Sequence, residues 1–72
     1  MTMLDEQVFN MEIRKLLKRF GISAQREIEK VVRSQIDSGE LSGDETLSAS
    51  VTLAIDDLDL RFRVEDTIAL SG

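Results

Sequence analysis

The chain has 72 residues, a net charge of −5, and no cysteine, histidine, tryptophan, tyrosine or proline. A chain of this length forms one domain at most, and so small a domain buries only about 60% of the surface that its unfolded chain exposes. The missing thiols and imidazoles exclude disulfides and leave no ligand set for structural zinc. We therefore expect no metal and no cofactor, and either an idealised core or oligomerisation as the source of further stability.

The N-terminal segment, residues 1–6, is acidic and has no basic region followed by a long apolar run. It does not resemble a signal peptide, and no stretch of the chain is apolar enough to span a membrane. We therefore expect a cytoplasmic protein. Charge is distributed unevenly, because residues 1–36 carry a net charge of +2 and residues 37–72 carry −7. The basic first half thus has an acidic counterpart in its own chain or in a second subunit.

The first half has the apolar spacing of amphipathic helices. One stripe predicts a helix at about 4–20 and consists of Phe9, Ile13, Leu16, Leu17 and Phe20. Gly21 follows this stripe as a left-handed cap would, and Ser23 suits the N-cap of a second helix at about 24–38. A connection of about three residues predicts that the two helices form a helical hairpin.

The second half alternates between apolar and polar residues, which is typical of half-buried strands. We expect one strand at about 46–56 and another at about 58–70, with Asp56-Asp57 in the turn between them. A loop of two or of four residues keeps both apolar faces on one side. The predicted fold is therefore α+β: a single domain, residues 1–72, with two-layer ααββ architecture, in which the helical hairpin packs on a two-stranded antiparallel β-hairpin.

Catalysis has little support, because the chain lacks histidine, cysteine and tyrosine as acids, bases or nucleophiles. Asp66 is the one acidic residue in phase with the apolar, inward-facing residues of the second predicted strand. An irregular end of the strand at this position would also explain an acidic residue there. The acidic cluster Asp56-Asp57-Leu58-Asp59 lacks the alternating ligands and the glycine of a calcium loop. We therefore expect a protein that is not an enzyme, with a small-molecule enzyme built around Asp66 as a third hypothesis.

The segment Phe20-Gly21-Ile22-Ser23 resembles the turn of a helix-turn-helix motif. A nucleic-acid-binding regulator would use the basic faces of both helices, namely Arg14, Lys15, Lys18, Arg19, Arg26, Lys30 and Arg33. The position six residues after the glycine is Glu27 where that motif has an apolar residue, and the chain is acidic overall. A nucleic-acid binder is therefore the alternative hypothesis.

A second apolar patch lies on the first predicted helix, nearly opposite the stripe, and consists of Leu4, Val8 and Met11. A helix that is apolar on two sides is usually buried on two sides. The patch predicts a subunit interface of a homodimer, although a covering C-terminal segment or a frayed first turn also explains it. The leading hypothesis is therefore a non-catalytic protein-interaction module that self-associates and has no membrane partner.

Three segments carry a resemblance to a known family: Val8-Phe9-Asn10-Met11-Glu12-Ile13-Arg14-Lys15, Gly21-Ile22-Ser23-Ala24-Gln25-Arg26-Glu27-Ile28-Glu29-Lys30 and Gly43-Asp44-Glu45-Thr46-Leu47. Together with the paired apolar strands, they resemble a family of small uncharacterised bacterial proteins, a domain of unknown function. The resemblance covers nearly the whole chain. It implies a bacterial cytoplasmic setting, and it assigns no activity and no functional residue.

Overall fold

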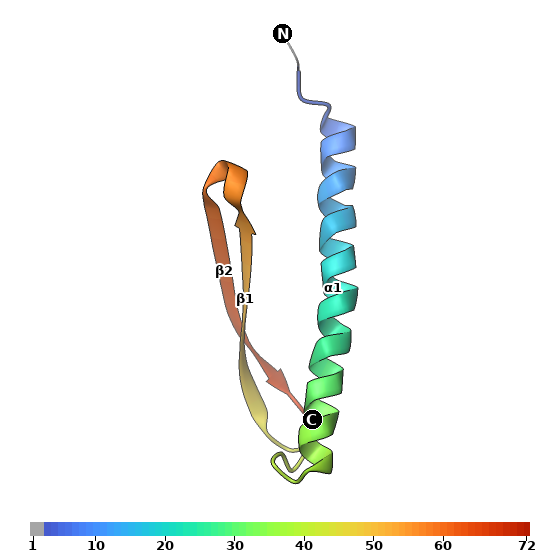
Figure 1. Ribbon diagram of the computed structural model, residues 1–72, viewed down its shortest axis with the longest axis vertical. Helices are drawn as coiled ribbons and strands as arrows, with labels where there is room; N and C mark the ends of the chain where they lie inside the picture. Colours follow the sequence, from blue (N-terminus) through green and yellow to red (C-terminus); the bar gives the residue numbers. More distant parts are fainter. Residues whose placement is uncertain (1–2) are drawn as a thin grey trace. The chain divides into compact units, whose positions relative to one another are not determined.

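The computed structural model describes residues 3–72. Its elements are α1 (Glu6–Asp37), β1 (Thr46–Ile55), the short 3-10 turn η1 (Asp56–Leu58) and β2 (Leu60–Ala69) (Figure 1). The chain divides between Gln35 and Ile36 into two compact units. A helix combined with an antiparallel sheet confirms the α+β class, whereas a single domain over the whole chain stays a prediction.

The predicted helical hairpin is wrong, because one helix of 32 residues replaces the two helices expected at about 4–20 and about 24–38. Figure 1 shows α1 as one unbroken ribbon. Gly21 lies inside the helix with a negative φ, since the described glycines with positive φ are Gly39 and Gly43. The left-handed cap expected at Gly21 therefore lies at the true end of the helix, where the N–H of Gly39 donates to the carbonyl of Ile36 at 3.1 Å.

The helix continues through Gly21 because its apolar stripe continues in phase. Phe9, Phe20 and Val31 lie 11 residues apart, and Ile13 and Ala24 repeat the same interval. Eleven residues make about three helical turns, so such residues share one face of a continuous helix. We define the apolar stripe of α1 by the residues of this repeat, which are Phe9, Ile13, Leu17, Phe20, Ala24, Ile28 and Val31. Glycine within a helix costs about 1 kcal/mol relative to alanine, which an extended apolar stripe can offset.

The helix begins at Glu6, two residues later than the sequence-based boundary at about residue 4, and it has an N-cap. Asp5 is this cap, because its Oδ1 accepts hydrogen bonds from the N–H groups of Gln7 (3.1 Å) and Val8 (3.2 Å). Its own carbonyl accepts the first helical hydrogen bond from Phe9 at 2.9 Å. Leu4 therefore precedes the helix, at the position from which an apolar residue can pack on the fourth helical residue, Phe9.

Replacement of Asp5 by alanine is expected to destabilise the helix by about 1 kcal/mol, because two N–H groups lose their acceptor. Thermal unfolding followed by far-ultraviolet circular dichroism measures this loss. Asp5→Asn is the matched control, since it keeps a side-chain oxygen at the same position and should retain most of the stability. Equal unfolding midpoints for Asp5→Ala and the wild type would show that this end of α1 is frayed in solution.

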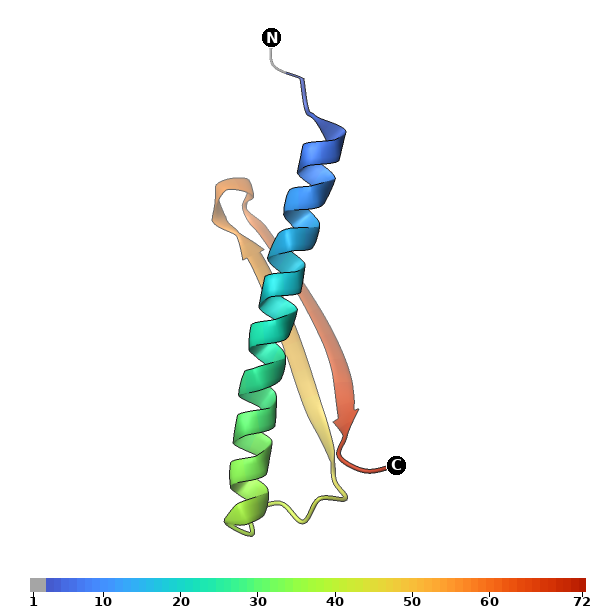
Figure 2. The same ribbon diagram turned by 90° about the vertical axis from the view of Figure 1, so that its right-hand side faces the viewer.

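The hairpin pairs β1 with β2 in a regular antiparallel register from Ile55↔Leu60 to Thr46↔Ala69. The N–H of Leu70 extends the pairing by one hydrogen bond to the carbonyl of Glu45, at 3.0 Å. Figure 2 shows the two strands side by side along their length. The antiparallel two-stranded sheet predicted from the alternating sequence is thereby confirmed.

The loop of the hairpin has four residues, which settles the alternative left open by the sequence. Leu58 belongs to η1 rather than to the second strand, so β2 begins at Leu60 instead of about residue 58. Asp59 closes the turn with φ 54°, and its N–H donates to the carbonyl of Asp56 at 3.2 Å. Aspartate tolerates this left-handed backbone better than most residues that carry a Cβ.

The two faces of the hairpin differ in character. The pairs of one face are Leu47↔Ile68, Ala49↔Asp66, Val51↔Val64, Leu53↔Phe62 and Ile55↔Leu60. The pairs of the other face are Thr46↔Ala69, Ser48↔Thr67, Ser50↔Glu65, Thr52↔Arg63 and Ala54↔Arg61. The sheet thus has one apolar and one largely polar face, as alternating strands require.

Candidate interaction surfaces

The apolar surfaces of both units lack a core. No described residue, from position 3 to 72, is buried in the single chain. On the stripe of α1, Phe20 is 50% exposed; on the apolar face of the hairpin, Phe62 is 59% exposed. Exposed apolar surface of this extent on a small protein is typical of an interaction site.

The structure places the predicted interface residues Leu4, Val8 and Met11 around the start of α1. Val8 (53% exposed) and Met11 (68%) lie on the helix, and Leu4 (60%) lies just before its N-cap. At 100° per residue, Val8 and Met11 point to the side of the helix opposite the stripe. That these three residues form a subunit interface stays a prediction.

The helix-turn-helix interpretation is wrong, because Phe20-Gly21-Ile22-Ser23 lies within α1 and forms no turn. All seven cations of the alternative hypothesis are nevertheless on this one helix. Lys15 and Arg26 lie 11 residues apart, as do Arg19 and Lys30, so the continuous helix aligns these four on one face. Arg33 joins the same face, and Arg14 and Lys18 lie beside it, which makes the basic face of α1.

Acidic residues neutralise only part of this basic face. Lys15 Nζ lies 3.9 Å from Glu12 Oε2, and Arg33 donates to Glu29 Oε2 at 3.3 Å. Both pairs lie within one helix and are exposed, so each contributes little stability. Within the described part of the chain, the cations without an ion pair on α1 are Arg14, Lys18, Arg19, Arg26 and Lys30.

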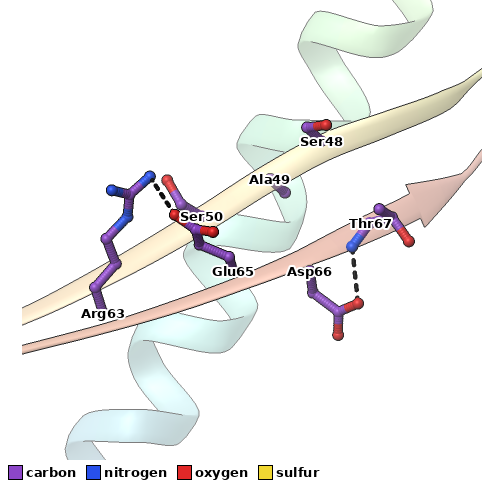
Figure 3. Close-up of a pocket in the computed structure, with 7 residues that line it drawn as sticks. All are labelled: Ser48, Ala49, Ser50, Arg63, Glu65, Asp66 and Thr67. Carbon is purple, nitrogen blue, oxygen red and sulfur yellow. Dashed lines mark hydrogen bonds and ion pairs between the residues drawn. The ribbon is translucent and has the colours of Figure 1, made fainter.

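An open depression of about 470 Å³ lies on the hairpin, lined by Ser48, Ala49, Ser50, Arg63, Glu65, Asp66 and Thr67. Arg63 Nη2 contacts Glu65 Oε1 at 3.1 Å, and the N–H of Thr67 donates to Asp66 Oδ1 at 2.8 Å. Figure 3 shows the Asp66 carboxylate apart from the Arg63–Glu65 pair.

Asp66 lies on the apolar face of the sheet, as its parity predicts. β2 runs through it to Ala69 in unbroken register, so the alternative of an irregular strand end at Asp66 is wrong. The residue opposite is the small Ala49, and the carboxylate is exposed. The depression is open and its carboxylate is exposed, so it offers no support for the enzyme hypothesis.

The turn before β1 is organised around the carboxylate of Glu45. The N–H groups of Ser42 and Gly43 donate to its two oxygens at 2.8 Å and 2.9 Å. These hydrogen bonds, led by that of Ser42, lower the pKa of Glu45 from 4.5 to about 2. Gly43 has φ 104°, a conformation that only glycine adopts readily, and this fits its place in the turn.

The lowered pKa predicts a pH dependence. Its contribution to stability is complete above the ordinary value of 4.5 and is lost as the pH falls through about 2. Glu45→Gln removes this titration, so the variant should be less stable than the wild type at neutral pH, and the difference should shrink between pH 5 and pH 2. Thermal unfolding over that range measures it. A constant difference across the range would contradict the hydrogen bonding of Glu45 in solution.

Residues 3–72 contain no group of three or more acidic side chains placed to hold a metal ion. In the same range, α1 is not apolar enough over any stretch of sufficient length to cross a membrane.

Sequence reasoning missed two features of these surfaces. It ended the apolar stripe at Phe20, although the interval of 11 residues that carries it on to Val31 was visible in the sequence. It also read the segment before β1 only as a connection, although Glu45 following Ser42 and Gly43 is the kind of acceptor that closes a short turn.

The fold defines a class of protein: a small α+β chain. Its described residues form one long amphipathic helix and one β-hairpin, and they enclose no site. The chain belongs to a family of unknown function, DUF6494, which matches residues 3–71. The resemblance to a domain of unknown function is thereby confirmed. No curated protein and no solved structure is significantly similar to the chain.

Proposed function

We propose that the protein is a non-catalytic interaction module that acts as a homodimer in the cytoplasm. The observation that carries the proposal is the apolar stripe, which runs in phase along α1 while none of residues 3–72 is buried. Burial of apolar surface is the dominant favourable term in folding, so a single copy lacks its main source of stability.

A second copy is the cover that the chain's chemistry favours. Chains below about 70–80 residues generally need a disulfide, a metal or a partner subunit in addition to their core. Cysteine and histidine are absent from this sequence, so the first route is closed and the second lacks its usual ligands. A twofold dimer uses the same surface on both copies, and a uniform apolar stripe is self-complementary in this sense.

Light scattering after size exclusion, over a range of protein concentrations, tests the proposal directly. The expected mass is twice 8.1 kDa. A mass of one chain at every concentration, together with cooperative unfolding, would contradict it.

Val8→Asp, with Gln7→Asp as matched control, locates the interface. Both variants place a carboxylate in the first turn of α1, but only Val8 belongs to the patch opposite the stripe. Dissociation by Val8→Asp alone would assign the interface to Leu4, Val8 and Met11. An unchanged dimer in both variants would leave the stripe as the interface.

Nucleic-acid binding is a second candidate, favoured by the alignment of cations on one continuous helix. Binding through this basic face would be sensitive to salt, because it rests on phosphate neutralisation. Fluorescence anisotropy with labelled DNA and RNA at low salt tests it, with Arg26→Glu/Arg33→Glu expected to abolish binding. A flat titration of the wild-type protein would remove this candidate.

A further inference from the structure

We infer that two copies of α1 pair antiparallel through the apolar stripe, with Phe20 and Gly21 at the twofold axis. The inference rests on the proposed self-association and adds the orientation and register of the interface. It follows from the order of large, small and charged residues along the single helix, which is apparent only once α1 is continuous through Gly21.

The side-chain sizes along the stripe complement one another in the antiparallel direction. With the axis beside Phe20, Leu17 faces Ala24 of the second copy, and the two Phe20 rings lie side by side across the axis. Alternation of large and small side chains across an interface is what lets two helices approach closely.

A parallel pair in register lacks this complementarity. It sets Leu17 against Leu17 and Ala24 against Ala24, so that one level of the interface is crowded and another is poorly filled. Unfilled volume and overpacking both cost stability in a close-packed interface. The antiparallel direction also places the positive N-terminal end of each helix dipole beside the negative C-terminal end of the other.

Charge complementarity supports the same register. Glu12 and Lys30 lie 18 residues apart, which is about five turns of helix, so both flank the same side of the stripe. In an antiparallel pair this side of one helix meets the same side of the other, and Glu12 comes within one residue, about 1.5 Å along the axis, of the level of Lys30 of the second copy. Twofold symmetry produces this pair twice. Among the described residues of its own chain Lys30 has no ion pair, whereas Glu12 has only the long, exposed contact with Lys15.

Cysteine cross-linking tests the orientation, because the natural chain has no cysteine to interfere. Ile13 and Ile28 face each other in the antiparallel register, while Ile13 of one copy lies about 22 Å along the axis from Ile13 of the other. A disulfide requires Cα atoms within about 7 Å. Ile13→Cys and Ile28→Cys are therefore purified separately, mixed in reduced form and then oxidised.

The expected result is a disulfide-linked mixed dimer from the mixture and almost no linked dimer from either variant alone. Self-linking of each variant alone would overturn the antiparallel orientation in favour of the parallel one. Reduced samples that remain dimeric but never link would place the interface elsewhere and overturn the inference, while leaving the proposed self-association intact. A monomeric wild-type protein would instead refute the proposed function itself.

A charge exchange provides a second test that leaves the stripe untouched. Glu12→Lys should raise the dimer Kd about tenfold at low salt, because two ion pairs become two repulsions. Glu12→Lys/Lys30→Glu should restore the wild-type Kd, since the exchanged charges again attract across the axis. A Kd that stays raised in the double variant, or that never changes, would overturn this register.

Discussion

Gly21→Pro is expected to destabilise the protein by about 3 kcal/mol or more. Proline at this position removes a helical N–H, and its ring clashes with the carbonyl of Leu17 one turn earlier. In the helical hairpin that the sequence first suggests, residue 21 has a positive φ, which proline cannot adopt, so Gly21→Ala rather than Gly21→Pro distinguishes the two structures. The far-ultraviolet circular dichroism of the variant should show loss of helix and a strongly lowered unfolding midpoint.

Gly21→Ala at the same position should have the opposite effect. Gly21 has a negative φ, and a Cβ there meets no atom within 4 Å, so alanine adds helix propensity without strain. The expected gain is up to about 1 kcal/mol. A left-handed cap at residue 21 would reverse this sign, because alanine is strained at positive φ. A destabilised Gly21→Ala would therefore contradict the continuous helix.

The sequence predicted the hairpin better than the helix for a physical reason. Alternation fixes which side chains share a face of a sheet. Every second position from Leu47 to Ile55 and from Leu60 to Ile68 could therefore be assigned to one apolar face. The length of the loop could not, since two and four residues preserve the same alternation. Its four residues depend on η1 and on the left-handed Asp59, which parity does not specify.

The helix boundary failed because local signals at residues 21–23 compete with a longer pattern. Gly21 is typical of a helix end and Ser23 of a helix start, and each preference amounts to about 1 kcal/mol. The interval of 11 residues that aligns Phe9, Phe20 and Val31 extends over the whole helix and outweighs them. The same continuity that removes the helix-turn-helix motif also aligns the basic residues along one face.

The candidate surfaces could be predicted only in part. Spacing alone showed that Val8 and Met11 share one face of the helix. It also showed that Asp66 lies on the apolar face of its strand. The capping role of Asp5 and the acceptor role of Glu45 depend on backbone N–H groups that no spacing rule locates. The strongest apolar surface was hidden, because a stripe divided between two helices appears as two short core faces rather than one long interface.

Phe20→Asp is expected to dissociate the dimer. Loss of a buried phenylalanine costs about 3–5 kcal/mol, so the Kd should rise at least about a hundredfold, even before the cost of burying a carboxylate is added. Phe20 is half exposed in the single chain, so the substitution removes little from the isolated helix. Light scattering at matched concentrations should therefore report single chains.

Ile22→Asp is the matched control, because it adds the same charge two residues further along α1. Ile22 is 45% exposed, close to the 50% of Phe20, but it lies on the side of Val8 and Met11. If the stripe forms the interface, only Phe20→Asp dissociates the dimer, and both variants keep a helical spectrum. If Ile22→Asp dissociates it and Phe20→Asp does not, the subunits meet through the opposite face. Because both side chains are similarly exposed in one copy, a difference between the variants points to what covers them in the assembly.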